Sequence, residues 1–150
     1  MLTSILISCA TITGTIVVHA AFMLAVLRGL RSTHAGRWAR RSYLTKVMAT
    51  SIVVLAMFFA SVVEAAIWAL VYIATGAMRN VEEAMYFSMV TYSTLGYGDI
   101  VLQEGWRLLA TFQAANGIIM FGWSTALIFT AVHAVYLSPP LAATGGSTDR

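Results

Sequence analysis

The sequence has few charged side chains. Charged residues make up 10% of its 150 residues and hydrophobic residues 59%, whereas ordinary soluble domains carry roughly 25% charged residues. A water-soluble domain of this size needs more charge to cover its surface, so soluble enzymes, nucleic-acid-binding proteins and disordered chains are poor interpretations. The composition predicts a protein embedded in a membrane, with no nucleic-acid partner.

Cysteine is almost absent as well. The single cysteine, Cys9, cannot form a disulfide within the chain and has no neighbours at metal-ligand spacing, and we expect it to be a small buried residue. The eight methionines follow no metal-ligand spacing either. No His/Glu or Ser/His constellation shares a helix face, so neither an enzyme activity nor a cofactor is expected.

Three long runs contain almost no charge. Residues 1–27, 47–75 and 106–137 are each long enough to cross a bilayer, which takes about 20 predominantly apolar residues. The first run could be a cleaved signal peptide, but its positive charge follows the apolar residues instead of preceding them, and we interpret it as a retained transmembrane helix. Residues 138–150 are rich in proline and glycine and are expected to form a disordered tail.

Positive charge is concentrated in one connection. Six of the nine basic residues lie between Arg28 and Lys46. Because cationic loops stay on the cytoplasmic side of a membrane, residues 28–46 are predicted to be a basic cytoplasmic loop, with the N-terminus outside and the C-terminus in the cytoplasm. We expect a multi-pass protein of the cell membrane (plasma or inner membrane), whose basic loop attracts anionic lipid headgroups.

A shorter helix is predicted between the second and third runs. Asn80 can cap a helix and Glu83 stands three residues further on, as in a capping box. The predicted helix, residues 81–93, is too short to cross a bilayer and is typical of a re-entrant segment that enters from the outer face. Its C-terminal end carries a partial negative charge, which favours a cation near the middle of the membrane.

The loop after this helix, residues 94–98, has glycine at alternate positions, Gly96 and Gly98. Left-handed torsions cost nothing at glycine, and torsions of alternating sign turn successive carbonyl oxygens to one side. Irregular backbone at membrane depth must be buried in protein or line water. The loop therefore predicts a ladder of oxygen ligands for a cation.

The sequence Thr94-Leu95-Gly96-Tyr97-Gly98-Asp99 resembles the selectivity filter of potassium channels. The resemblance implies that four identical chains surround one pore and that K+ is the bound ion. The ligands would be the main-chain carbonyls of Thr94, Leu95, Gly96, Tyr97 and Gly98, with the Thr94 hydroxyl at the inner end.

Residues 47–137 are similar to the pore module of small prokaryotic potassium channels. In that comparison residues 47–75 are the outer helix, 81–93 the pore helix, 94–98 the filter and 106–137 the inner helix. The resulting fold class is an all-α membrane protein with three transmembrane helices, a re-entrant pore helix and a selectivity filter, assembled as a homotetramer.

The resemblance also implies residues that support the filter. Tyr86 and Phe87 occupy the positions of the pore-helix aromatic pair, and only Tyr86 can donate a hydrogen bond. Val90 stands where some relatives carry a glutamate that bonds the aspartate after the filter, so Asp99 is expected to lack that partner.

Glu64 is the one carboxylate deep within a predicted span. Such residues are costly and face a partner or a cavity. We expect Glu64 to anchor the outer helix to the pore helix or the inner helix behind the filter, with Asn116 and Arg107 as candidate partners. In the alternative, Glu64 lies near the outer interface and reaches water.

The inner helix carries the predicted cavity and gating residues. Gly117 lies where the family often has a hinge glycine, although glycines in membrane helices also permit close packing. Ile118, Phe121 and Thr125 recur on one helical face and are expected to line the cavity.

The first span has no regular arginines and so is not a voltage sensor. We expect it to flank the pore module at the periphery of the tetramer. His19 and His133 could sense pH but are more typical of packing residues. We expect the helix to pack through a small polar patch composed of Thr3, Thr11, Thr13, Gly14 and Thr15.

The sequence therefore predicts a potassium-selective pore that conducts K+ passively. Two alternatives stay open: a weakly selective cation channel and a non-conducting accessory membrane protein. The gating stimulus is not encoded in any feature of the sequence.

Overall fold

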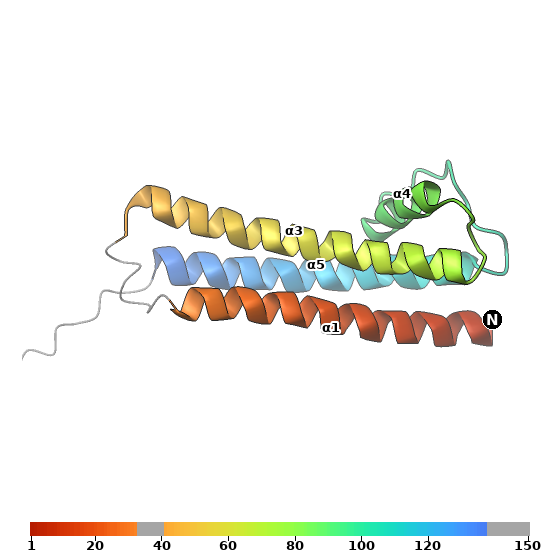
Figure 1. Ribbon diagram of the computed structural model, residues 1–150, viewed down its shortest axis with the longest axis horizontal. Helices are drawn as coiled ribbons and strands as arrows, with labels where there is room; N and C mark the ends of the chain where they lie inside the picture. The colour runs from red at the N-terminus through yellow and green to blue at the C-terminus, as the bar shows by residue number, and fades with distance from the viewer. Residues whose placement is uncertain (33–40, 138–150) are drawn as a thin grey trace, which may run out of the picture.

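The computed structural model describes residues 1–32 and 41–137, and every element in these ranges is an α-helix. Three long helices, α1 (Leu2–Ser32), α3 (Tyr43–Ala74) and α5 (Arg107–Tyr136), lie side by side (Figure 1). The short helix α4 (Val81–Tyr92) lies at the end of the bundle where the N-terminus is found. The predicted order of three long helices with one short helix before the last is confirmed.

The three long helices are long and apolar enough to cross a membrane. At about 1.5 Å per residue, α4 is only about 18 Å long and does not reach across the hydrocarbon core. The chain is thus an all-helical multi-pass membrane protein, as its composition predicts.

Two helices extend into the segment predicted to be a basic loop. Helix α1 continues to Ser32 instead of ending at residue 27, and α3 begins at Tyr43 instead of residue 47. Helix α3 starts there because Ser42 caps it: the Thr45 N–H donates to the Ser42 side chain at 3.4 Å. The centre of the basic segment, 33–40, and the tail, 138–150, lie outside the described residues.

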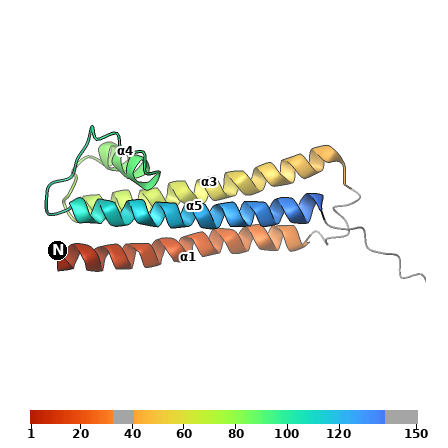
Figure 2. The same cartoon turned by 180° about the vertical axis from the view of Figure 1, so that it is seen from behind.

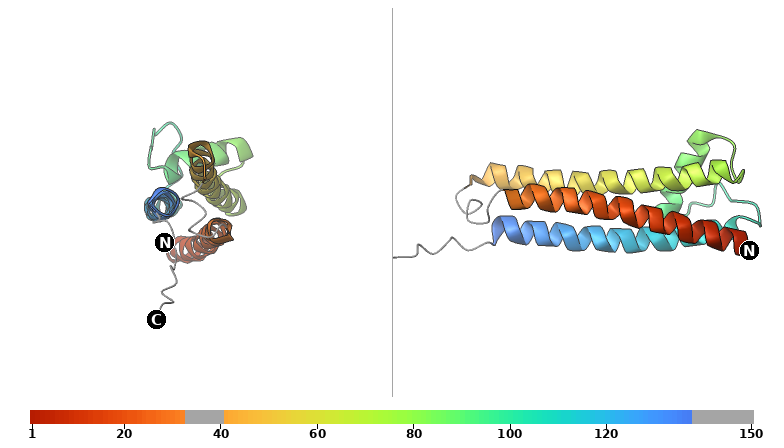
Figure 3. Two further views of the ribbon diagram at one scale, coloured as in Figure 1. Left: turned by 90° about the vertical axis from the view of Figure 1, so that its left-hand side faces the viewer. Right: turned by 60° about the horizontal axis from the view of Figure 1, so that its bottom comes forward.

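Helices α3 and α5 form the middle of the bundle. Helix α4 packs on one side of this pair and α1 on the other (Figures 2 and 3). The core between α3, α4 and α5 is aromatic and aliphatic, and its fully buried members include Trp68, Tyr72, Tyr92, Leu109 and Met120. This core positions α4 against both transmembrane helices of the predicted pore module.

Helix α1 packs on α3 and α5 of its own chain through a polar stripe. The predicted polar patch is only partly correct, because Thr3, Thr13 and Gly14 lie on the exposed face and Cys9 is exposed too. A helix repeats every 3.6 residues, so the inward stripe has spacings of three and four. Its members are Ser4, Ser8, Thr11, Thr15 and His19.

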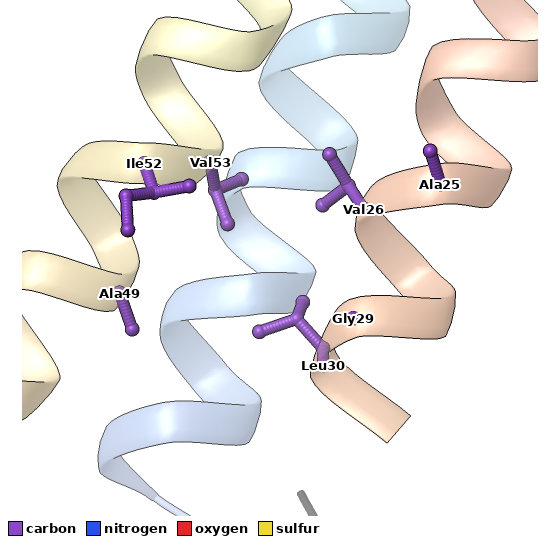
Figure 4. A pocket seen from close by; sticks show the side chains of 7 residues that line it. All are labelled: Ala25, Val26, Gly29, Leu30, Ala49, Ile52 and Val53. Atoms are coloured by element: carbon purple, nitrogen blue, oxygen red, sulfur yellow. The ribbon is translucent and has the colours of Figure 1, made fainter. Parts of the chain in front are cut away.

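At the end of the bundle opposite α4, helices α1 and α3 leave an apolar groove between them (Figure 4). The groove has a volume of ≈ 380 Å³. Arg28 and Lys46 lie on the two helices that form it. The lining residues are Ala25, Val26, Gly29, Leu30, Ala49, Ile52 and Val53.

Candidate functional site

Helix α4 begins as the sequence predicts. Asn80 has extended backbone torsions, and its side chain accepts a hydrogen bond from the Glu82 N–H at 2.9 Å. Glu82 and Glu83 occupy the first turn, where the positive end of the helix dipole favours carboxylates. The opposite end, at Tyr92, is therefore the partially negative end, and the loop at 94–98 follows it directly.

The loop alternates its backbone torsions. The φ angles of Thr94, Gly96 and Gly98 are +60°, +56° and +77°, so positive values fall at every second position of 94–98. Alternation at the glycines is what the sequence predicts. Thr94 was not predicted to have positive φ, because β-branched residues rarely adopt it. The one indication in the sequence is that Thr94 lies two residues before Gly96, as Gly96 lies two residues before Gly98.

The start of the loop is tied to the last turn of α4. The N–H groups of Leu95 and Gly96 both donate to the Val90 carbonyl, at 2.9 and 3.3 Å, and the Thr94 N–H donates to the Thr91 carbonyl at 3.0 Å. Val90 thus contacts the loop through its main-chain carbonyl oxygen and not through its side chain. Because two N–H groups share one acceptor, the loop reverses direction sharply at the end of the helix.

Asp99 has a hydrogen-bond partner in Tyr86. The Tyr86 hydroxyl donates to Asp99 Oδ2 at 2.7 Å. Asp99 has no glutamate partner at position 90, where the chain carries valine, and a phenol on α4 takes the place of that carboxyl. This hydrogen bond is the main cause of a pKa below the ordinary value for Asp99 and above it for Tyr86. Phe87 instead makes a T-shaped contact with the Tyr72 ring, with centroids 5.3 Å apart.

Replacing Tyr86 with phenylalanine is expected to raise the pKa of Asp99 toward its ordinary value of about 3.9. A lowered carboxyl pKa contributes stability at pH values above the ordinary pKa, and this contribution is lost as the pH falls through the lowered pKa. Inactivation of ion flux by acid on the side of the membrane that Asp99 faces should therefore begin at higher pH in Tyr86→Phe than in the wild type. Tyr43→Phe, an exposed tyrosine at the other end of the bundle, is the control, and equal acid profiles for all three proteins would contradict the assignment.

Glu64 joins α3 to α4, the predicted pore helix, as expected, but its partners differ from the candidates. Its side chain is 0% exposed, so it does not reach water. The Tyr92 hydroxyl donates to one carboxylate oxygen, and His19 Nδ1 lies 2.8 Å from the other. The candidate partners have other contacts: Asn116 donates to Thr15 on α1, and Arg107 donates to the Leu102 carbonyl.

A second polar cluster, not anticipated from the sequence, holds the middle of α4. The Ser88 hydroxyl donates to the Ala65 carbonyl on α3. Gln113 on α5 donates to the Ser88 hydroxyl at 2.6 Å and to its carbonyl at 3.2 Å, and accepts from the Tyr72 hydroxyl. Gln113 could have indicated this cluster in the sequence, because an amide within an apolar span requires a polar partner.

Gly117 lies where α5 meets the end of α4. A Cβ atom added to Gly117 would lie 2.0 Å from the Tyr92 carbonyl oxygen, so the structure gives this glycine a close-packing function beside the predicted hinge. Ile118, Phe121 and Thr125 are exposed on α5 in the single chain, as a cavity-lining face requires. Phe121 also packs against the Tyr92 ring, with centroids 5.5 Å apart.

Comparison with known families agrees with this arrangement. A family model described as "Ion channel" matches residues 43–134, which is more than half of the chain and includes α3, α4, the loop and almost all of α5. No curated protein and no solved structure matches the chain. The chain belongs to the ion channel family of proteins with two transmembrane helices per pore module, and α1 precedes the matched segment.

Proposed function

We propose that the chain is one subunit of a homotetrameric potassium channel that conducts K+ passively through the loop at 94–98. The K+ ions are the transported substrate. In this proposal they shed water as they enter and are held by the carbonyl oxygens of Thr94, Leu95, Gly96, Tyr97 and Gly98, which replace the hydration shell.

The alternating φ angles at Thr94, Gly96 and Gly98 carry the proposal. Alternation aims successive carbonyls at one side without placing side chains there, and hard oxygen ligands suit an alkali cation. The negative end of α4 adds to the attraction. Entry of one ion into a row of such sites helps to expel the next, so tight coordination does not prevent fast conduction.

The exposed surfaces of the single chain support a tetramer. Leu95 and Tyr97 in the loop are 56% and 66% exposed, and Ile118 on α5 is 62% exposed. One such loop cannot surround an ion, whereas four copies related by rotation can, and assembly would bury these apolar side chains. A tetramer around a central pore therefore accounts for the apolar side chains that are exposed in the single chain.

The proposed orientation has the N-terminus and α4 on the outer side. Arg28 and Lys46 lie at the opposite end of the bundle, which the positive-inside rule places in the cytoplasm of the cell membrane. The apolar groove between α1 and α3 lies at the same end. Its apolar lining and the adjacent cations suit an anionic lipid, with the acyl chain in the groove and the headgroup beside the basic residues.

Flux measurements on the purified protein in liposomes test the proposal. Wild-type protein is expected to carry K+ down its gradient and to be blocked by Ba2+. Tyr97→Ala should reduce the K+ flux at least about tenfold, because assembly of the tetramer would no longer bury the Tyr97 ring beside the loop. Tyr43→Ala, on an exposed tyrosine far from the loop, is the matched control.

The rival functions give different outcomes in the same assay. Intact tetramers without flux would identify a non-conducting accessory protein. Equal K+ and Na+ fluxes would identify a weakly selective cation channel.

A further inference from the structure

Three buried polar side chains from three different helices meet in the interior of the bundle. His19 of α1 is 1% exposed, Glu64 of α3 is 0% exposed and Tyr92 of α4 is 1% exposed. Glu64 lies about 15 Å along the helix from the end of α3 at Ala74, which places the cluster well inside the membrane. A carboxylate at this depth is costly unless its oxygens are paired, and here each oxygen has its own partner.

The imidazole ring of His19 is fixed on more than one side. Its Nδ1 atom lies 2.8 Å from Glu64 Oε1, and its Nε2 atom lies 3.4 Å from the Ser124 hydroxyl on α5. The ring also stacks on Trp123, with centroids 5.2 Å apart and planes at 28°. One side chain of α1 therefore contacts both α3 and α5, and its orientation toward Glu64 is determined by these contacts.

Tyr92 connects this cluster to the filter loop. It is the last residue of α4, two residues before Thr94. Its carbonyl faces Gly117 and its ring packs against Phe121, while its hydroxyl is bound by Glu64. A shift of the hydroxyl would therefore move the end of α4, and with it the Val90 carbonyl that accepts from Leu95 and Gly96.

We propose that His19 is a positioning residue for ion selection, acting through Glu64 and Tyr92 on the start of the filter loop. Helix α1, which precedes the segment matched by the family model, then contributes to the ion selectivity of the channel. This inference rests on the proposed function, because it concerns the selectivity of the loop at 94–98.

Substitutions of His19 in the full-length protein test this role through the ratio of K+ to Na+ permeability. His19→Ala removes the group that orders Glu64, and we expect the ratio to fall up to about tenfold, the effect of losing one hydrogen bond. His19→Asn places an amide N–H near the position of Nδ1 and should retain most of the ratio. His19→Gln places its amide near Nε2, toward Ser124, and should behave like His19→Ala.

A second substitution tests the route through Tyr92. Tyr92→Phe removes only the hydroxyl, and we expect it to lower the permeability ratio about as much as His19→Ala. Residues that act in one chain of contacts are not additive, so His19→Ala should cause little further loss in the Tyr92→Phe background. His133→Ala, on an exposed histidine of α5, is the control and should match the wild type.

The outcomes separate this inference from the proposed function. Wild-type channels without K+ selectivity would contradict the proposed function itself. Selective wild-type channels whose ratio is unchanged in His19→Ala and His19→Gln would contradict only the positioning role, as would equal ratios in His19→Asn and His19→Gln. If His19→Ala fails to assemble, the comparison of the Asn and Gln variants decides the question.

Discussion

Replacing Gly117 with alanine should abolish or strongly reduce ion flux. The added Cβ would lie 2.0 Å from the Tyr92 carbonyl oxygen and 2.9 Å from its carbonyl carbon, and backbone cannot move aside as a flexible side chain can. Overpacking of this kind typically costs about 1–3 kcal/mol. Because Tyr92 ends α4, the strain falls on the residues that lead into the loop at 94–98, and we expect flux to decrease more than assembly.

The control for this prediction lies on the same helix. Gly122 is exposed and a Cβ added there meets no atom within 4 Å, so Gly122→Ala should keep wild-type thermal stability in detergent. Melting temperature and K+ flux would be measured for both variants. Equal losses of melting temperature and K+ flux in the two variants would mean that α5 tolerates an added methyl group at neither position. That result would contradict a specific role for the contact between Gly117 and Tyr92.

Replacing Gly96 with alanine should also remove K+ conduction, for a different physical reason. A Cβ at Gly96 meets no atom within 4 Å of the single chain, but its φ angle is +56°, a region that costs L-residues about 1–2 kcal/mol each. In a tetramer the cost recurs in every subunit. The loop is then expected to relax to negative φ at this position, which breaks the alternation and turns a carbonyl away from the ions.

Gly105 provides the comparison for Gly96. It lies in the connection between the loop and α5, has ordinary φ and has open space at its Cβ position. Gly105→Ala should therefore conduct like the wild type, and the two variants would be compared by K+ flux at equal amounts of tetramer. Retained flux in Gly96→Ala would contradict the requirement for positive φ in the loop.

The architecture was predictable because it depends on local properties of the chain. Long apolar runs predict the three spans, and Asn80 with two following glutamates predicts the start of α4, which the cap to Glu82 confirms. The helix ends were less predictable: Ser42 extends α3 by capping, and basic residues at the ends of α1 and α3 are compatible with helix. The charge of the connection between them was read as evidence of a loop, which is only partly correct.

The contacts that support the site were much harder to predict. The pairing of Glu64 with His19 joins residues that are 45 positions apart, and sequence alone gives no depth or rotation for α1 relative to α3. For Tyr86 the sequence predicts one half of the contact. Its ability to donate a hydrogen bond was evident, but the acceptor, Asp99, was not identified. The torsion of Thr94 was unpredictable for a third reason, since its own side chain disfavours the conformation that the loop imposes.

Hydrogen bonds hold α4 at its beginning, its middle and its end. Asn80 caps its beginning, Ser88 in its middle binds both α3 and α5, and Tyr92 at its end binds Glu64. A helix of 12 residues is marginal on its own. Its orientation toward the loop at 94–98 therefore depends on the neighbouring spans, including α1.

The selection of K+ by the loop at 94–98 is tested by the reversal potential of channels in a planar bilayer, with K+ on one side and Na+ on the other. If the loop selects K+, the potential is displaced far from zero in the direction that marks K+ as the permeant ion. A potential near zero, with currents of similar size carried by the two ions, would contradict selection of K+ by the loop at 94–98.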